Sequence, residues 1–177
     1  MTNVITSTFR RDGNAVPITW AGITTLDSQV LVGNNTTVAV PIYTVTGQVE
    51  ITALYGVITT ALGNNTTAFF RTNDGSTQNA ITLATGTTLT SAIAGGLISK
   101  KAGVGTALTL TAATSAQVME SATAGATTFQ DFIINSNPLA TSNIEFVYST
   151  TDTPTTGAIT FYIRWVPLTA GANITAL

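Results

Sequence analysis

The sequence contains neither cysteine nor histidine. The absence of cysteine excludes disulfide bonds, thiolate nucleophiles and cysteine metal sites. The absence of histidine excludes histidine-based triads, imidazole proton shuttles and metal sites with imidazole ligands. The most common catalytic and metal-binding chemistries are therefore not open to this chain.

Charged residues are also scarce, at 8% of the 177 residues, whereas about 25% is usual. The basic residues include two pairs, Arg10-Arg11 and Lys100-Lys101, and no patch that would neutralise phosphates. The eight carboxylates are scattered singly. We therefore expect no nucleic-acid partner, no cofactor and no enzymatic activity. The alternative is a glycosidase-like pair of carboxylates that folding brings together.

Long apolar runs are missing as well, because none reaches the roughly 20 residues that a membrane helix needs. Residues 1–11 lack the basic and then apolar order of a signal peptide. Asn73-Asp74-Gly75 lacks the repeated acidic positions of a calcium loop. We expect no membrane partner, no secretion and no metal site.

Threonine is abundant, at 38 of 177 residues, and β-branched residues suit strands better than helices. The clearest strand pattern is in residues 157–168, where Ile159, Phe161, Ile163 and Trp165 alternate with Thr160, Tyr162 and Arg164. This alternation predicts that Trp165 lies in the core. Pro167 has no N–H group for a strand ladder, so strand pairing should stop there.

Residues 144–148 alternate in the same way, and the segment between the two runs, residues 152–157, is rich in turn formers. The sequence therefore predicts that these two runs pair as an antiparallel hairpin. A third alternating run covers residues 48–57, with Val49, Ile51, Ala53, Tyr55 and Val57 in phase, and Gly56 is expected to mark a bulge or a bend.

Shorter pieces complete the pattern. Residues 68–71 are predicted to form a strand, and Asn73-Asp74-Gly75-Ser76 is predicted to form a turn. The pentapeptide Gly-Asn-Asn-Thr-Thr occurs twice, at residues 33–37 and 63–67, and we expect two loops with the same turn chemistry. Regularly spaced strand-like runs with glycine-rich turns and no helical pattern predict an all-β fold. We expect residues 21–177 to form one antiparallel β-sandwich or jelly-roll-like domain.

Residues 1–20 differ from the rest because they mix polar residues with isolated apolar ones. They are expected to form an N-terminal arm or an irregular first strand, either frayed or lying on a neighbouring subunit. The contact candidates in this segment are Phe9, Arg10, Arg11 and Trp20. In the C-terminal strand the candidates are Tyr162 and Arg164, on the face opposite the core.

Residues 45–57 and 163–168 together resemble small β-rich decoration or cement proteins of tailed bacteriophages. The resemblance implies a β-sandwich on the capsid surface of a virion, often a homotrimer, that bridges neighbouring subunits of the major capsid protein. It covers two stretches of the chain and carries over no functional residue.

A weakly charged surface suits permanent contacts, because burying an imperfectly paired ion costs several kcal/mol. The sequence therefore favours a structural protein that binds itself and a shell. The alternatives are another virion part, such as a tail or fibre component, and a carbohydrate-binding module. Fibre proteins favour regular repeats and binding modules favour exposed aromatic rows, and the sequence shows neither clearly.

Overall fold

The computed structural model describes residues 5–11, 14–20, 24–25, 29–30, 37–62, 66–89, 92–100, 103–111, 130–136, 141–150 and 157–177. These residues form fifteen strands in three antiparallel sheets and contain no helix. The predicted all-β antiparallel fold is confirmed. The glycines and asparagines of the two repeated pentapeptides lie outside the described residues.

Sheet I has seven strands. Their bounds are β3 (Thr24–Thr25), β4 (Gln29–Val30), β6 (Gln48–Thr60), β10 (Leu97–Ser99), β11 (Thr109–Thr111), β12 (Phe132–Asn135) and β14 (Ala158–Pro167). The long pair β6–β14 forms its centre, β10 and β12 pair with the other edge of β6, and β3 and β4 pair with β14.

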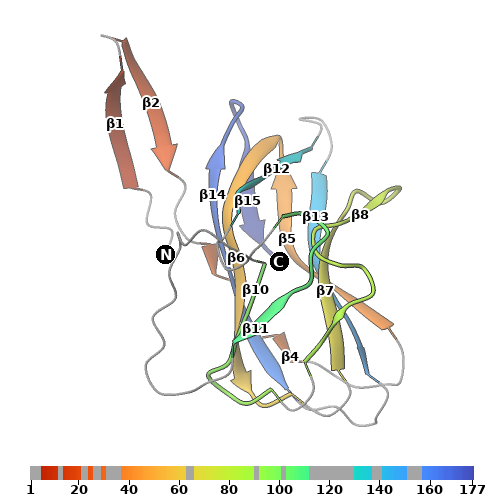
Figure 1. The fold of residues 1–177 in the computed structure, drawn as a ribbon. Coiled ribbons are helices and arrows are strands. Elements are labelled where there is room, and N and C mark those ends of the chain that lie inside the picture. The colour runs from red at the N-terminus through yellow and green to blue at the C-terminus, as the bar shows by residue number, and fades with distance from the viewer. Residues whose placement is uncertain are drawn as a thin grey trace.

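Sheet II has six strands. Their bounds are β5 (Thr37–Thr46), β7 (Thr66–Asn73), β8 (Gln78–Ala80), β9 (Thr87–Thr88), β13 (Thr141–Thr150) and β15 (Asn173–Ala176). Strand β13 lies between β5 and β7, and β15 and β8 are at opposite edges. The two sheets face each other as the layers of a sandwich (Figure 1). The jelly-roll strand order stays a prediction.

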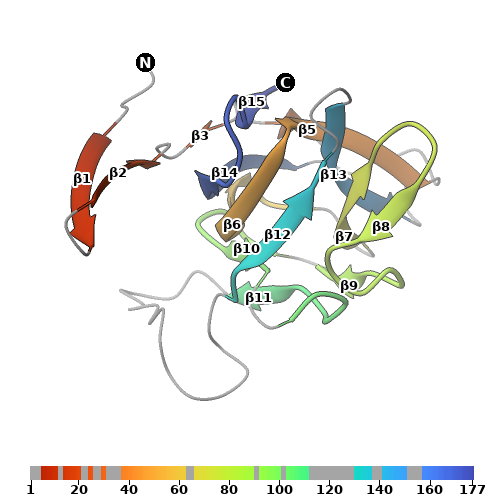
Figure 2. The ribbon, with the colours of Figure 1, turned by 90° about the horizontal axis from the view of Figure 1, so that it is seen from above.

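A separate hairpin is formed by β1 (Ile5–Arg11) and β2 (Asn14–Trp20). It lies to one side of the sandwich in two perpendicular views (Figures 1 and 2). Residues 5–11 and 14–20 thus form two regular strands and not an irregular one. Their role as an arm toward a partner stays a prediction.

The predicted hairpin between residues 144–148 and 157–168 is wrong. Strand β13 belongs to sheet II and pairs with β5 and β7, whereas β14 belongs to sheet I and pairs with β6. The two strands meet face to face instead, and the ring centroids of Phe146 and Phe161 are 5.0 Å apart. Each strand has an apolar row on one face, Ile144, Phe146 and Tyr148 in β13 and Ile159, Phe161 and Ile163 in β14, and packing the two rows against each other across the core buries both.

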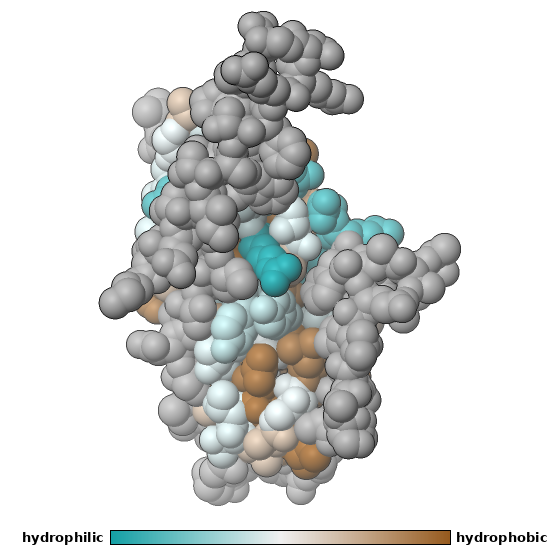
Figure 3. Space-filling view, turned by 90° about the vertical axis from the view of Figure 1, so that its left-hand side faces the viewer, coloured by the Kyte–Doolittle hydropathy of each residue, from teal (hydrophilic) through white to brown (hydrophobic). Residues whose placement is uncertain are grey.

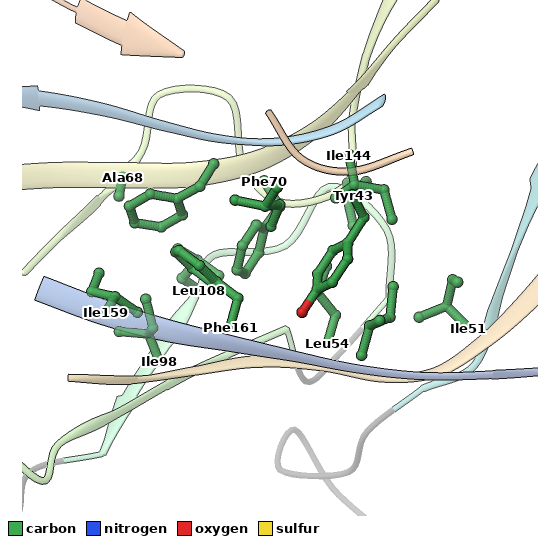
Figure 4. Close-up of a cluster of buried hydrophobic side chains, with 14 of the residues drawn as sticks. Tyr43, Ile51, Leu54, Ala68, Phe70, Ile98, Leu108, Ile144, Ile159 and Phe161 are labelled. Atoms are coloured by element: carbon green, nitrogen blue, oxygen red, sulfur yellow. The ribbon is translucent and has the colours of Figure 1, made fainter. Parts of the chain in front are cut away.

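The core between the sheets is centred on three phenylalanines. Phe70 lies 5.4 Å from Phe146 and 6.0 Å from Phe161 between ring centroids, and all three are fully buried. Figure 4 shows Phe70 and Phe161 between the two layers, with Tyr43 and Leu54 beside them. Trp165 is 5% exposed, which confirms its predicted place in the core.

Gly56 was expected to mark a bulge or a bend, and it does not mark a bulge. The register between β6 and β14 shifts at two other places, where Thr59 and Thr52 are the extra residues of β6. Gly56 is instead a point of close approach, because an added Cβ would lie 2.7 Å from Cγ2 of Ile159. Only glycine fits this position without displacing Ile159.

Pro167 is the last paired residue of β14, as expected. The next residue, Leu168, donates its N–H to the carbonyl oxygen of Gln48 at 2.9 Å. Because bonded and non-bonded pairs alternate in an antiparallel ladder, Pro167 occupies a pair that needs no N–H toward β6. The proline therefore ends the strand without leaving an unmet hydrogen bond on β6.

Candidate interaction surfaces

The outer face of sheet I is built by the residues of β14 that alternate with its core residues. Arg164 lies across from Ala53, Tyr162 across from Tyr55, and Thr160 across from Val57. Leu97 of β10 extends the last row on the other side of β6. A basic residue, two tyrosines and two aliphatic residues therefore follow one another along the strands.

The two tyrosines form the most ordered contact on this face. Their rings are stacked, with centroids 5.1 Å apart and an angle of 11° between the planes. Partial burial raises the pKa of the Tyr55 hydroxyl above its ordinary value, and the positive charge of Arg164 acts in the opposite direction. A stacked pair held by two neighbouring central strands is a rigid, amphipathic platform.

Tyr162 and Arg164, both predicted as contact residues, are thus brought together on one surface, with Arg164 exposed and Tyr162 half-buried. Tyr55 was missed because the alternation placed it in phase with Val49 and Ile51, which are buried. The extra residue at Thr52 reverses the two faces of β6, so Leu54 points inward and Tyr55 outward. Strict alternation of inward and outward residues along the sequence cannot reveal such a bulge.

The composition of this face suits a protein contact. Figure 3 views the side of the molecule on which β6 and β14 lie, and shows a strongly hydrophilic residue among pale ones, with hydrophobic residues gathered toward one end. By register Val57 and Leu97 belong to this face, and both are half-buried. Tyrosine and arginine are enriched in protein interfaces, and lysine and carboxylates are depleted in them. We call the surface of Tyr55, Val57, Leu97, Tyr162 and Arg164 the tyrosine face.

The other four predicted contact residues lie on the hairpin. By backbone register Phe9 is opposite Val16, Arg10 opposite Ala15, Arg11 opposite Asn14, and Trp20 opposite Ile5. The structure therefore places these four residues on a different sheet from Tyr162 and Arg164.

The outer face of sheet II carries a cross-strand ion pair. The Nε atom of Arg71 donates to Oε2 of Glu145 at 2.6 Å, and Nδ2 of Asn73 donates to Oε1 of the same carboxylate at 2.9 Å. Nη1 of Arg71 also donates to Oε1 of Gln78 at 2.5 Å. Glu145 is 5% exposed, and its two oxygens are each bonded. This network joins β13, β7 and β8, and its role is structural.

Lys100 is the one lysine described, and it is buried. Its Nζ donates to the carbonyl oxygen of Gln130 at 2.8 Å and lies 4.7 Å from the centroid of the Phe132 ring. Burial lowers the pKa of Lys100, and the nearby charge of Asp131 partly opposes this effect. The side chain ties the start of β12 to β10.

Asp74 is the exposed carboxylate of the predicted turn, which the structure confirms. Its Oδ1 accepts the N–H groups of Ser76 and Thr77 at 2.8 and 2.6 Å, and Gly75 has a φ of 91°. These hydrogen bonds lower the pKa of Asp74, and the bond from Thr77 has the largest effect.

Among the described residues no three carboxylates gather in a group that could hold a metal ion. The part of the chain that the structure describes also contains no helix with the length and hydropathy to cross a membrane.

Comparison with known proteins gives no family assignment. No family model matches the sequence, no curated protein is similar to it, and no solved structure matches its fold.

Proposed function

We propose that this protein is an adhesive structural subunit that decorates a larger protein shell and bridges neighbouring shell subunits through the tyrosine face. The observation that carries the proposal is the stacked Tyr55–Tyr162 pair beside the exposed Arg164 on a central, rigid part of sheet I. Such a surface binds by contact area and needs no reactive group.

The composition supports a binding role over a catalytic one. With no histidine and no cysteine, and with 8% charged residues, the chain offers little acid–base or nucleophilic chemistry. A shell presents many identical sites close together, so modest contacts from each copy add up through effective concentration.

The resemblance of residues 45–57 and 163–168 to tailed-phage decoration proteins points to a phage capsid as that shell. The major capsid protein as partner, a homotrimeric assembly and a location on the virion belong to the same proposal.

The experiment is cosedimentation with capsids assembled from the major capsid protein encoded with this chain. The double variant Tyr162→Ala, Arg164→Ala should lose most of the bound fraction. Phe69→Ala is the matched control, because Phe69 is a half-buried aromatic residue on the outer face of sheet II. If the double variant and the Phe69→Ala control both bind capsids as well as the unchanged protein does, the tyrosine face is not the adhesive surface.

A carbohydrate-binding module is the second candidate, and the same tyrosine pair favours it because aromatic rings bind the apolar faces of sugars. The rings, however, stack on each other, which leaves less of each ring face for a sugar. Retention on a polysaccharide column that Tyr162→Ala abolishes, together with no binding to capsids, would favour this reading.

A further inference from the structure

Arg164 differs from the other basic side chains that the structure describes. Nε of Arg71 is bonded to Glu145 at 2.6 Å. Lys100 is buried, and its Nζ donates to the carbonyl oxygen of Gln130. Arg164 is exposed, and no hydrogen bond or ion pair joins its guanidinium group to another described residue. Five N–H donors in a planar fork are therefore open to a partner at one end of the tyrosine face.

The strand that carries Arg164 holds it in a fixed place. Strand β14 pairs with β6 on one side and with β3 and β4 on the other. Strand β2 also contacts β14, and Arg164 is exposed with β2 in that place. The guanidinium group thus projects from a paired strand and not from a loop. Binding a partner there needs no ordering of the backbone, which lowers the entropic cost of association.

The neighbours of Arg164 add hydrogen-bond donors and apolar area. Tyr162, two residues earlier on the same face, stacks on Tyr55. The positive charge of Arg164 lowers the pKa of the Tyr55 hydroxyl against the larger effect of burial, which shows that the two groups are close. Guanidinium and phenol groups both donate hydrogen bonds to carboxylates, and the bonds to an ionised acceptor are the stronger ones.

One carboxylate shares the outer face of sheet I with Arg164. Glu50 is opposite Val166, two residues beyond Arg164 in β14, and on its other side it is opposite Ile133 of β12. The extra residue Thr52 lies between Glu50 and the row of Arg164, and the two charged groups form no ion pair. Glu50 is half-buried and Arg164 is exposed, so the cation is the more accessible of the two charges.

This arrangement favours one kind of anion. Tyr162 and Glu50 lie on opposite sides of the Arg164 row along the strands. A single carboxylate can approach Arg164 from the tyrosine side, away from Glu50. A nucleic acid presents a line of phosphates, and the phosphates that follow the first would meet the like charge of Glu50. An acidic side chain on a protein surface therefore suits the tyrosine face better than a polyanion.

The groove between the sheets has the opposite charge. It lies between β12 of sheet I and β8 of sheet II, and its volume is about 310 Å³. Among the described residues that line it, Asp74 is acidic and none is basic. An acidic partner would be repelled there. Complementarity to an acidic partner is thus a property of the tyrosine face and not of the groove.

We propose that the tyrosine face recognises an acidic site on the shell protein, where a carboxylate of the shell protein pairs with the guanidinium group of Arg164. Apolar atoms beside that carboxylate pack on the stacked rings of Tyr55 and Tyr162. Glu50 limits the site to one carboxylate, because it repels a second one. The inference rests on the proposed adhesive function and adds the charge of the partner surface to it.

Single charge changes test this by cosedimentation with capsids made from the major capsid protein that is proposed as the partner. Arg164→Gln should bind at least about tenfold more weakly, because a hydrogen-bonded charge pair is lost. Thr175→Glu is the matched control. It changes the net charge by the same amount at an exposed residue of β15 in sheet II, and it should bind like the unchanged protein. Equal affinities of Arg164→Gln and Thr175→Glu would overturn the proposal.

Glu50→Gln should act in the opposite direction. Removal of the neighbouring anion should tighten binding about twofold at low salt. Asp74→Asn makes the same change of charge in the turn between β7 and β8 and should have no effect. Added salt should weaken binding of the unchanged protein more than binding of Arg164→Gln. Weaker binding by Glu50→Gln than by Asp74→Asn would indicate a basic partner and overturn the proposal.

The same measurements separate this inference from the adhesive function. Capsid binding that responds neither to Arg164→Gln nor to salt would reject the acidic partner and keep the adhesive function. A lack of binding by the unchanged protein would reject both.

Discussion

At the scale of single residues, the sandwich depends on a few side chains that join the sheets. Phe70 and Phe146 come from sheet II and Phe161 from sheet I, and their rings meet at 5.0 to 6.0 Å. Trp165 continues the same inner row of β14. Alternation along β14 was sufficient to predict this face, because the extra residues at both register shifts belong to β6 and none belongs to β14.

Trp165→Ala should therefore lower the free energy of unfolding by about 3–5 kcal/mol, the usual range for removing a buried tryptophan. The neighbouring Arg164→Ala should change it by less than about 0.5 kcal/mol, since Arg164 is exposed. Reversible urea denaturation measures both. A loss under about 1 kcal/mol for Trp165→Ala would contradict its place in the core.

Gly56→Ala should be destabilising by about 1–3 kcal/mol, because the added methyl group overlaps Cγ2 of Ile159. The companion change Ile159→Ala removes the overlapping atom. In a double-mutant cycle the two changes together should therefore be less destabilising than the sum of the single changes. Strict additivity would show that the close approach does not determine the choice of glycine.

Lys100 makes stability depend on pH in the alkaline range. Burial holds its pKa below the unfolded value of 10.5, so between the folded pKa and 10.5 the unfolded chain binds the additional proton. Stability should therefore rise as pH increases through that window. The difference in unfolding free energy between the unchanged protein and Lys100→Met, measured at several pH values below 10.5, should show this rise. A difference independent of pH would contradict it.

At the scale of elements, sequence patterns predicted the strands better than their partners. Residues 68–71, the Asn73–Ser76 turn and the end of β14 at Pro167 follow from local chemistry, and each is found in the structure. The pairing of β13 with β14 was wrong because a turn-rich connection fits a hairpin and a crossing between sheets equally well. Nothing local distinguishes these two outcomes.

The turn between β7 and β8 gives an element-scale prediction. Asp74→Ala removes the acceptor for the N–H groups of Ser76 and Thr77 and should lower stability, while Asp74→Asn keeps an oxygen in place and should lower it less. The pKa of Asp74 is lowered from 3.8, so its stabilisation is present above that value and is lost as pH falls below it. Acid titration of Asp74→Ala should lack this loss. An identical acid transition in the variant would count against the role of the carboxylate.

At the scale of the whole molecule, part of the tyrosine face was visible in the sequence. Tyr162 and Arg164 could be assigned to the outer face from period two alone, but Tyr55 could not, because the bulge at Thr52 changes the phase of β6. The groove between β12 of sheet I and β8 of sheet II also had no sequence signal, because its walls come from two different sheets.

We propose that the protein works by adhesion to a shell, and saturable binding to capsids is the direct test of this function. Increasing amounts of the purified protein are sedimented with a fixed amount of capsids made from the major capsid protein that is proposed as its partner. The bound protein should reach a plateau at a fixed number of copies per capsid without any added ligand. Protein that stays in the supernatant at every concentration would contradict the claim.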